Sequence, residues 1–585
     1  MSHAEDKRIH FFASPLTNPR GTYSPAKHGD EEVQVSNVQL THTISEGTPP
    51  YANEDECLHD SPAFKRHSEA TSTELFYDLF FVANLTTFTS SHEINDHKQL
   101  TSYIGFFCIL WFTWYQVSLH DLRFSVDSLF ERVCKALQFG FMVGFAVTGT
   151  KFQPDDEELY WDYFRDLSYI LMGTRFVLMF QYIAALWFTK EYERVRLPLL
   201  LIIINCAVAA FAYLGLSFAF KYESTGPHAY IGWYVISVAE TALTTAVSSS
   251  WRQVSFKGTH MVQRMSLLTL IILGEGIIGL TKSITYIVKN DNVFTSAIIG
   301  NIAAAVLVIY FLFLIYFHRM TEHHFGTIRQ QIWSFLHFPL HVALVLTMEG
   351  SRQFVLWRQG VQLAGYLTDS IEAVIEPYDL DQPQPEDTYS SWYDQFNDIA
   401  YNQTFLYSPK GSDISEYENK FNNALETFYN VSLEVAHGES NATDEIATTI
   451  ANMWTVLSDA VFAMVGIPVE EESKDDSEEP NAAAEDLASP KWYTLFRLVF
   501  IYTFVCAGLT LMIMGVLGLI SHHHKTTAGR IRSAVTLVIG LGICLLSIIS
   551  VSDDTFGDYV GSAWVLPTLV LSFFVVVVVD NIRKH

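Results

Sequence analysis

The feature that most constrains this chain is a series of apolar blocks, each about 20 residues long. An α-helix rises 1.5 Å per residue, so about 20 apolar residues cross the hydrocarbon core of a bilayer, which is about 30 Å thick. The blocks predict membrane-spanning helices at residues 74–91, 101–119, 134–150, 165–188, 197–219, 229–250, 264–286, 296–317, 332–356, 493–519, 532–551 and 561–580. We therefore expect an all-α fold, a polytopic membrane helix bundle with about 12 transmembrane helices.

Composition favours lipid as the solvent. Charged residues make up only 17% of the 585 residues, whereas soluble proteins contain about 25%. The formal net charge is −27, so nucleic acid is not an expected partner. The expected partners are the lipid bilayer and a small solute or ion, and a homo-oligomer is compatible with this fold class. The six cysteines form no C-x-x-C pair, which argues against a disulfide framework or a zinc finger.

The polar stretches divide the chain into four expected parts. Residues 1–70 are predicted to be a disordered cytosolic tail, because their composition cannot bury a core. Residues 71–357 are predicted to form a membrane core of nine helices. Residues 358–492 are expected as an extracellular or lumenal loop with amphipathic helices, and 493–585 as three further transmembrane helices.

Two segments of the long loop, 416–433 and 444–466, carry apolar residues at helical spacing. We expect both to form amphipathic helices of a small external cap rather than membrane spans. If 444–466 crossed the membrane, the basic loop before the span at 532–551 would lie outside, and the charge bias of the C-terminal region would reverse.

The distribution of charge predicts the orientation. With the N-terminus inside, the inner loops hold 16 Lys and Arg residues and the short outer loops hold five. Since such residues collect in cytoplasmic loops, both termini are expected in the cytosol. Sequons for N-glycosylation begin at Asn402, Asn430 and Asn441 in the loop expected outside, whereas the sequon at Asn84 lies within the first span and should be silent. The sequence leaves the plasma membrane and the vacuole open as destinations.

Several strings resemble one family. TELFYDLFFVANLTTFT from Thr73 is similar to the "ELFFDLVFV" signature that opens the bacterial low-temperature-requirement A (LtrA) proteins, and the stretch from Trp114 to Arg132 resembles their "TNWYDTRF…D…ER" segment. HMVQRMSLLTLIILGEGIIGL from His260 resembles their "H..ERFGLFVIIVLGES" helix. Two later strings, YFLFLIYFHR and WSFLHFPLHVALVLTMEG, also match in order, so the resemblance covers about residues 72–352.

The resemblance implies the architecture of the membrane core more than its chemistry, since the family name records a cold-growth phenotype. A long form with a glycosylatable loop and three added spans resembles the fungal members. The match departs in two places: Gly276 replaces the family's serine after Glu275, and His318 stands where an aspartate is usual.

Charged residues within the apolar spans are candidate site residues, because a charge near the bilayer centre costs at least ~2.5–3.5 kcal/mol. Arg175, Glu240 and Glu275 are expected near mid-span, and His341 and Glu349 lie in the ninth span. We expect Arg175 to satisfy one carboxylate of a buried cluster and the other carboxylate to exchange protons, as in a proton-coupled carrier. A static polar clasp that holds three helices together explains the same residues equally well.

Glu74 and Asp78 lie one turn apart at the inner mouth of the first span, and Asp121 and Arg123 lie at the same side of the membrane. The favoured interpretation is a salt-bridge network that locks the helix ends. The functional alternative is an inner gate or an ion vestibule.

Four side chains at the end of the eighth span and the start of the ninth could form a zinc or iron site: His318, Glu322, His337 and His341. Pro339 interrupts the second pair, and histidines that serve as hydrogen-bond partners or pH-sensitive groups are the favoured alternative. The sequence does not identify a cofactor.

The leading hypothesis is a transporter or channel-like protein for a small solute or ion, coupled to protons. The first alternative is an intramembrane metal-dependent enzyme or redox protein, although no nucleophile motif favours an enzyme. The second is a membrane-state sensor, receptor or scaffold that acts through the external cap. Gly274, Gly276 and Gly279 around Glu275 indicate either close helix packing, which is favoured, or a broken helix beside the carboxylate.

Overall fold

The regular elements of the computed structural model are helices throughout the described part of the chain. The structure describes residues 10–16, 64–65, 69–92, 94, 96–154, 161–220, 228–251, 254–256, 259–289, 295–320, 327–379, 382–405, 414–437, 443–465, 467, 491–521 and 527–582. The expectation of an all-α fold is confirmed for these residues.

The first ten helices include the expected membrane core. They are α1 (Ser72–Ser91), α2 (His97–Phe124), α3 (Leu129–Gly149), α4 (Trp161–Thr189), α5 (Glu193–Ala219), α6 (Ile231–Ser250), α7 (Met261–Lys289), α8 (Ser296–Arg319), α9 (Thr327–Phe335) and α10 (His337–Ile375). The later elements are α11 (Glu386–Asp398), a π-helix (Ile399–Thr404), α12 (Ser415–Ala436), α13 (Thr443–Met464), α14 (Lys491–Ser521), α15 (Thr527–Leu546), a 3-10 turn (Ser547–Val551), α16 (Asp553–Gly561) and α17 (Val565–Asn581).

Local sequence signals explain where several of these helices begin. Thr71 and Glu74 form a reciprocal capping box at the start of α1. Asp96 and Ser128 accept hydrogen bonds from the first backbone amides of α2 and α3. Pro339 lies in the first turn of α10, where a proline removes no helical hydrogen bond. Helices α9 and α10 are separated by the single residue Leu336.

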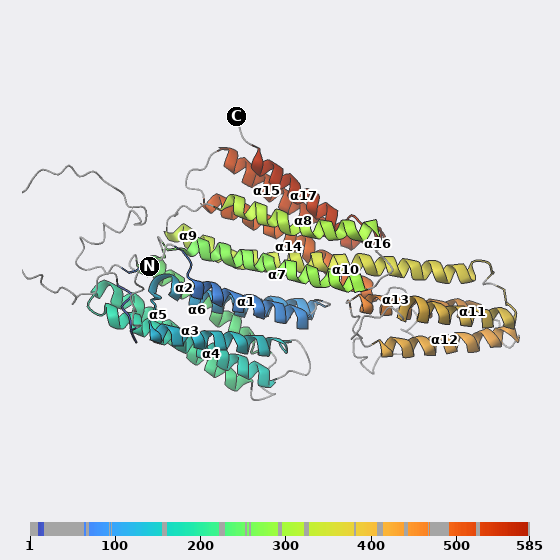
Figure 1. The fold of residues 1–585 in the computed structure, drawn as a ribbon, viewed down its shortest axis with the longest axis horizontal. Coiled ribbons are helices and arrows are strands. Elements are labelled where there is room, and N and C mark those ends of the chain that lie inside the picture. The colour runs from blue at the N-terminus through green and yellow to red at the C-terminus, as the bar shows by residue number, and fades with distance from the viewer. Residues whose placement is uncertain are drawn as a thin grey trace, which may run out of the picture.

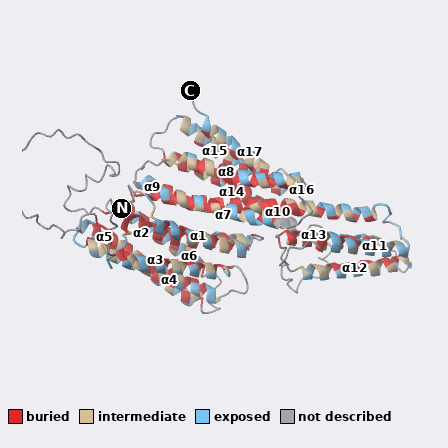
Figure 2. Ribbon diagram, in the orientation of Figure 1, coloured by how far each residue is buried: buried red, intermediate tan, exposed pale blue. Residues whose placement is uncertain are grey.

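The helices form an elongated bundle (Figure 1). Helices α1 to α6 gather along one side, α8, α14, α15 and α17 along the other, and α7 and α10 lie between the two groups. Helix α2 is buried along most of its length (Figure 2). At the periphery, large apolar side chains are exposed, including Trp187 at 67% and Val538 at 69%. Exposed apolar surface of this kind is what a lipid-facing surface requires.

Within the described residues, eight helices are long and apolar enough to cross a membrane, and nine if α16 and α17, which meet at a bend of 80°, count as one span. This result supports a multi-pass membrane fold, but it does not confirm the expected count of about 12. Helices α1, α2, α3 and α6 fall outside the set, whereas α13 meets the criterion. Buried polar residues such as Asp78 in α1 and Gln116 in α2 lower the mean hydropathy of these helices.

The ninth expected span is much longer than its apolar block. Helix α10 has 39 residues, which corresponds to about 58 Å and exceeds a hydrocarbon core of about 30 Å. The apolar block predicted a span that ends at 356, and the helix itself continues beyond it to Ile375 through a more polar, amphipathic stretch.

The C-terminal part of α10 packs against α11, the π-helix and α13 at one end of the bundle, and α12 packs on α11 and α13 (Figure 1). Together these elements form a second apolar cluster, which we call the cap and which includes Ile371, Trp392, Phe428 and Leu457. Helices α12 and α13 correspond to the two amphipathic segments predicted from the sequence, whereas α11 was not predicted. Ring stacking of Trp357 on Phe462, with centroids 5.2 Å apart, connects the cap to the bundle.

Two short parts of the N-terminal segment, which was expected to be disordered, are packed against the bundle. The carbonyl groups of His10 and Phe11 accept hydrogen bonds from the amides of Leu129 and Phe130, at 3.1 and 3.0 Å. These amides lie in the first turn of α3 and have no partner within the helix. Residues 17–63 of the predicted tail lie outside the described residues.

Candidate functional site

At the end of the bundle opposite the cap, α1 and α7 are connected by two ion pairs. Oε2 of Glu74 lies 3.0 Å from Nε2 of His260, and Oδ1 of Asp78 lies 3.0 Å from Nη2 of Arg264. Trp114 of α2 also donates its indole N–H to Asp78, at 2.7 Å. All of these side chains are buried. The two acidic residues and the two basic residues are each spaced i, i+4, so they face each other as two successive pairs along the helices.

The same end holds a third buried ion pair. Lys135 of α3 donates to both oxygens of Asp121 of α2, at 2.6 and 2.5 Å. The guanidinium group of Arg123 lies over the ring of Phe64, 5.0 Å from its centroid. We call this set of buried pairs the lock. Three of the four predicted gate residues, Glu74, Asp78 and Asp121, form its pairs, and the fourth, Arg123, lies over Phe64.

The basic partners in the lock were missed by the sequence analysis, which counted Arg264 and Lys135 as loop charges. One signal could have identified two of them. The i, i+4 spacing of His260 and Arg264 at the start of α7 matches the spacing of Glu74 and Asp78 at the start of α1.

Arg175 and Glu240 form a buried ion pair between α4 and α6, with Nε of Arg175 2.9 Å from Oε2 of Glu240. Nη1 of Arg175 also donates to the hydroxyls of Thr113 and Thr174, at 3.0 and 2.9 Å. The guanidinium group lies over the ring of Tyr213, 5.3 Å from its centroid. This arrangement satisfies most of the donors of one arginine with groups from three helices.

The third member of the predicted cluster lies elsewhere. Glu275 of α7 accepts a hydrogen bond from the hydroxyl of Thr86 on α1 and lines a pocket with residues of α1, α7 and α10. The expected single cluster of Arg175, Glu240 and Glu275 is therefore two separate groups. A similar depth in the membrane does not make residues neighbours, and the sequence does not give the order of the helices around the bundle.

The pocket at Glu275 has a volume of about 160 Å³ and borders the cap through Val465. Its lining is formed by Thr86, Thr89, Ser90, Glu275, Gly279, Lys282, Ser283, Arg352, Leu356 and Val465. Val465, one of these lining residues, directly follows α13, so the cap contributes to the wall of the pocket. The pocket contains polar groups of both charges within an otherwise apolar bundle, as expected of a ligand site.

Glu349 is not part of the lining of this pocket and is satisfied by residues of its own helix. Arg352 donates to both of its oxygens, with the shortest contact at 2.5 Å, and Gln353 donates at 3.2 Å. Of the predicted site residues Glu275 and Glu349, only Glu275 lines the pocket, and it has no ion-pair partner among the described residues.

Helix α7 runs past Glu275 without a break, from Met261 to Lys289. A methyl group on Gly276 would overlap the sulfur of Met348, and one on Gly279 would lie 3.3 Å from Cδ of Arg352. These glycines therefore allow α10 to approach α7 closely, and a broken helix is not what the structure contains.

His341 and His337 each use both ring nitrogens in hydrogen bonds. The indole of Trp111 is only a donor, so Nδ1 of His341 accepts its hydrogen at 3.0 Å and Nε2 donates to Thr269 at 2.8 Å. Nδ1 of His337 donates to the carbonyl of Trp333 at 2.8 Å, which leaves Nε2 to accept from Tyr316 at 3.0 Å. The two neutral rings are therefore opposite tautomers.

This arrangement does not fit the predicted metal site. The lone pair of each imidazole is directed at a donor hydrogen, from Trp111 for His341 and from Tyr316 for His337. His318 lies in the last turn of α8, and Glu322 lies outside the described residues. Among the described residues, no group of three or more His, Cys, Asp or Glu side chains could hold a metal ion.

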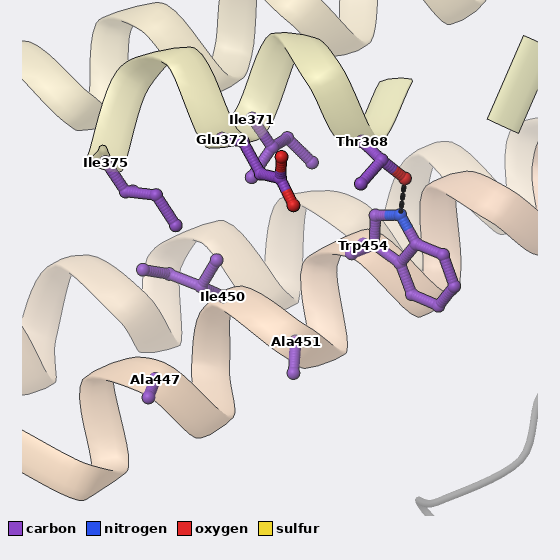
Figure 3. A pocket seen from close by; sticks show the side chains of 8 residues that line it. All are labelled: Thr368, Ile371, Glu372, Ile375, Ala447, Ile450, Ala451 and Trp454. Carbon is purple, nitrogen blue, oxygen red and sulfur yellow. Dashed lines mark hydrogen bonds between the residues drawn. The ribbon is translucent and has the colours of Figure 1, made fainter. Parts of the chain in front are cut away.

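A larger groove of about 270 Å³ lies within the cap, between α10 and α13 (Figure 3). Its walls are mostly apolar, with Ile371 and Ile375 facing Ile450. Trp454 donates its indole N–H to Thr368 at 2.9 Å (Figure 3). Since Glu372 is the one charged residue in its lining, the groove does not resemble a site for a small ion.

Two of the predicted glycosylation acceptors lie on the cap with exposed side chains, Asn402 in the π-helix and Asn430 in α12. Asn441 lies outside the described residues. The side chain of Asn84 is buried and donates to the carbonyl groups of Phe80 and Met142, at 2.8 and 2.9 Å.

The apolar helices, their lipid-facing side chains and the buried polar groups define an integral multi-pass membrane protein. Comparison with family models then identifies the family. Residues 69–370 match the model of the bacterial low temperature requirement A protein (LtrA). Because this match spans more than half of the chain, the protein belongs to the LtrA family. Neither the curated proteins nor the solved structures contain a match to this chain.

Proposed function

We propose that this protein is a membrane carrier for a small solute or ion, coupled to protons, and that Glu275 is its exchangeable carboxylate. The observation that carries the proposal is the pocket of about 160 Å³ that contains Glu275 inside a bundle of apolar helices. A carboxylate in such an environment persists when it binds a cation, exchanges a proton or has a fixed partner. Its hydrogen bond from Thr86 uses one oxygen, so the group retains acceptor capacity toward the pocket.

The arrangement of polar groups supports alternating access. The pocket lies toward the cap end of α1 and α7, with Val465 in its lining, and the opposite ends of these two helices are joined by the lock. Breaking the pairs of Glu74 with His260 and of Asp78 with Arg264 would separate these two helices at that end. In this proposal the lock is the inner gate, and α1 and α7 are the elements that move.

Arg175 and Glu240 have a supporting role in this proposal. They are paired away from the pocket and connect α4 to α6. This geometry favours the static clasp for these two residues, so the exchangeable charge is assigned to Glu275 alone.

Orientation follows from the charge bias and the sequons. We place both termini and the lock on the cytosolic side, and the cap with Asn402 and Asn430 on the extracellular or lumenal side. The proposed destination is the plasma membrane or the vacuole. A protease-protection assay on sealed vesicles, combined with removal of N-glycans, tests this orientation.

The test of the carrier is flux in proteoliposomes that contain the full chain. Proton and monovalent cation fluxes are compared for the wild type, Glu275→Gln and Glu426→Gln, the last of which changes an exposed carboxylate of α12. We expect flux in the wild type and in Glu426→Gln, and a loss of at least tenfold in Glu275→Gln at equal amounts of folded protein. Absence of flux in the wild type under every imposed gradient would contradict the proposal for these ions.

A second candidate, a receptor or scaffold, is supported by the groove in the cap. Filling the groove with Ala447→Phe would impair such a protein and would leave flux unchanged. The opposite result, loss of flux in Glu275→Gln with a functional Ala447→Phe variant, would favour the carrier.

A further inference from the structure

The charges at the pocket are arranged as two unlike, unpaired groups. Three charged residues line the pocket, and one of them, Arg352, is neutralised by its pair with Glu349, which has its shortest contact at 2.5 Å. Glu275 and Lys282 remain, and neither forms an ion pair within the described residues. The pocket therefore presents one carboxylate and one ammonium group, with no net charge.

Glu275 and Lys282 are seven residues apart on α7, which places their Cα atoms on one face, about 10.5 Å apart along the axis. Both side chains line the same pocket, so a ligand whose ammonium and carboxylate groups flank one carbon atom can contact one of them with each end. A simple cation or anion would satisfy one of the two protein groups and leave the other unpaired.

The rest of the lining agrees with such a ligand. The hydroxyls of Thr89, Ser90 and Ser283 offer donors and acceptors, and Leu356 and Val465 offer an apolar surface for a side chain. The volume of about 160 Å³ is below the range of about 300–1,000 Å³ that is typical of sites for drug-sized ligands. It suits a small metabolite.

We propose that the pocket binds small zwitterionic amino acids, with the ligand's ammonium group on Glu275 and its carboxylate on Lys282. This assignment rests on the proposed function in that it names the solute of the proposed carrier. It also gives Thr86 a role, because its hydroxyl fixes the carboxylate of Glu275 from the side of α1.

The experiment measures binding of three molecules of nearly equal shape to the full chain in lipid nanodiscs by calorimetry. Alanine carries both charges, isopropylamine replaces the carboxylate with a methyl group, and isobutyrate replaces the ammonium group with a methyl group. Since a hydrogen bond to a charged group is one of the stronger contacts in proteins, we expect alanine to bind at least tenfold more tightly than either analogue. Equal affinity for alanine and one analogue, or no binding of alanine to folded wild-type protein, would overturn the assignment.

Variants then assign the two ends of the ligand. Glu275→Gln should lower the affinity for alanine and abolish its advantage over isobutyrate, while Lys282→Gln should abolish its advantage over isopropylamine. Lys98→Gln, at an exposed lysine near the start of α2, is the matched control and should bind alanine as the wild type does. A Lys282→Gln variant that keeps full discrimination against isopropylamine would contradict the proposed contact.

The binding experiment and the flux experiment test the two proposals separately. If alanine binds with the expected charge dependence but no flux occurs in proteoliposomes, the site is supported and the carrier function is overturned. If Glu275-dependent cation flux occurs without alanine binding, the carrier is supported and the zwitterion site is overturned.

Discussion

Oδ1 of Asp78 on α1 lies 3.0 Å from Nη2 of Arg264 on α7, and both side chains are completely buried. The same carboxylate oxygen accepts the indole hydrogen of Trp114 on α2 at 2.7 Å, and the guanidinium group lies over that indole ring at 5.5 Å. Ser118 accepts a further hydrogen bond from Arg264 at 3.0 Å. Three helices therefore meet at a single buried ion pair, which makes this pair the centre of the lock.

Removing one charge of this pair should be strongly destabilising. Asp78→Asn leaves the guanidinium group of Arg264 buried without a counter-charge, and breaking a buried pair in this way costs about 3–5 kcal/mol. We expect a large decrease in the thermal unfolding temperature in detergent. If the lock is a gate, Asp78→Asn should also increase leak flux per folded molecule.

An exposed pair at the same end of the bundle provides the control. Asp127 and Arg132 form an ion pair with exposed fractions of 68% and 56%, and the hydrogen bonds from Arg132 lower the pKa of Asp127. Because exposed pairs contribute little, Asp127→Asn should change the unfolding temperature only slightly at neutral pH. Equal losses in Asp78→Asn and Asp127→Asn would contradict a structural role specific to the lock.

Glu240 should contribute to stability and not to proton exchange. Glu240→Gln keeps the shape of the side chain but removes the charge opposite Arg175, whose other hydrogen bonds are to the hydroxyls of Thr113 and Thr174. We expect a lower unfolding temperature and, in proteoliposomes, flux per folded molecule close to that of the wild type. Flux that is lost in Glu240→Gln but kept in Glu275→Gln would reverse the assignment of the exchangeable carboxylate.

Acid should destabilise the protein through His92, which follows α1 directly. Burial beside Phe88, whose ring stacks on the imidazole at 4.5 Å, lowers the pKa of His92 below its ordinary value. The unfolded state then takes up a proton first as the pH falls below about 6.5, so the stability contributed by the neutral ring is present above this pH and is lost below it.

The measurement is the unfolding temperature of the wild type and His92→Gln between pH 7.5 and pH 5, where the variant lacks the titrating group. We expect the wild type to lose more stability than the variant on acidification. Parallel curves for the two proteins would show that His92 does not contribute.

Because His341 acts as a hydrogen-bond partner, we predict that replacing it lowers the stability of the protein and leaves its metal content unchanged. His341→Phe leaves the indole N–H of Trp111 buried without an acceptor, which costs about 1–3 kcal/mol. The double variant with Trp111→Phe removes that donor and should recover part of the loss. Metal analysis of the wild type and His341→Phe should give the same zinc and iron content. Stoichiometric metal that disappears in the variant would restore the metal-site hypothesis.

The apolar blocks predicted the helical class and most helix positions, because membrane helices need long apolar segments. The blocks were less informative where helices contact other helices. Helix α10 continues beyond Leu356 as an amphipathic segment that packs on α13. Helix α13 is apolar enough to count as a span, although it packs within the cap. Hydropathy measures transfer into lipid and does not distinguish lipid from a protein interior.

The sequence was sufficient to predict which charged residues are buried, but not which of them lie close together. Depth along a span follows from counting residues, so Arg175, Glu240 and Glu275 were recognised as buried charges. Their division into a pair and a pocket depends on which helices are neighbours. Lys282 and Arg352, in contrast, lie near the ends of apolar blocks, where a basic residue is ordinary, so no sequence pattern connected them with Glu275.

Two glycines that meet between α14 and α15 provide a test of close packing in the C-terminal helices. A methyl group on Gly508 would overlap the carbonyl oxygen of Gly540 and lie 2.9 Å from the amide nitrogen of Cys544. Both obstacles are backbone atoms, which cannot move as a flexible side chain can. We therefore expect Gly508→Ala to force the helices apart and to cost about 1–3 kcal/mol.

Gly542 is the matched control, since it lies on α15 only two residues after Gly540 and a methyl group there meets nothing within 4 Å. At that position alanine removes the helix penalty of glycine, which is about 1 kcal/mol. The two substitutions should thus shift the unfolding temperature in opposite directions, down for Gly508→Ala and slightly up for Gly542→Ala. A Gly508→Ala variant at least as stable as the wild type would mean that α14 and α15 do not approach as closely as these glycines imply.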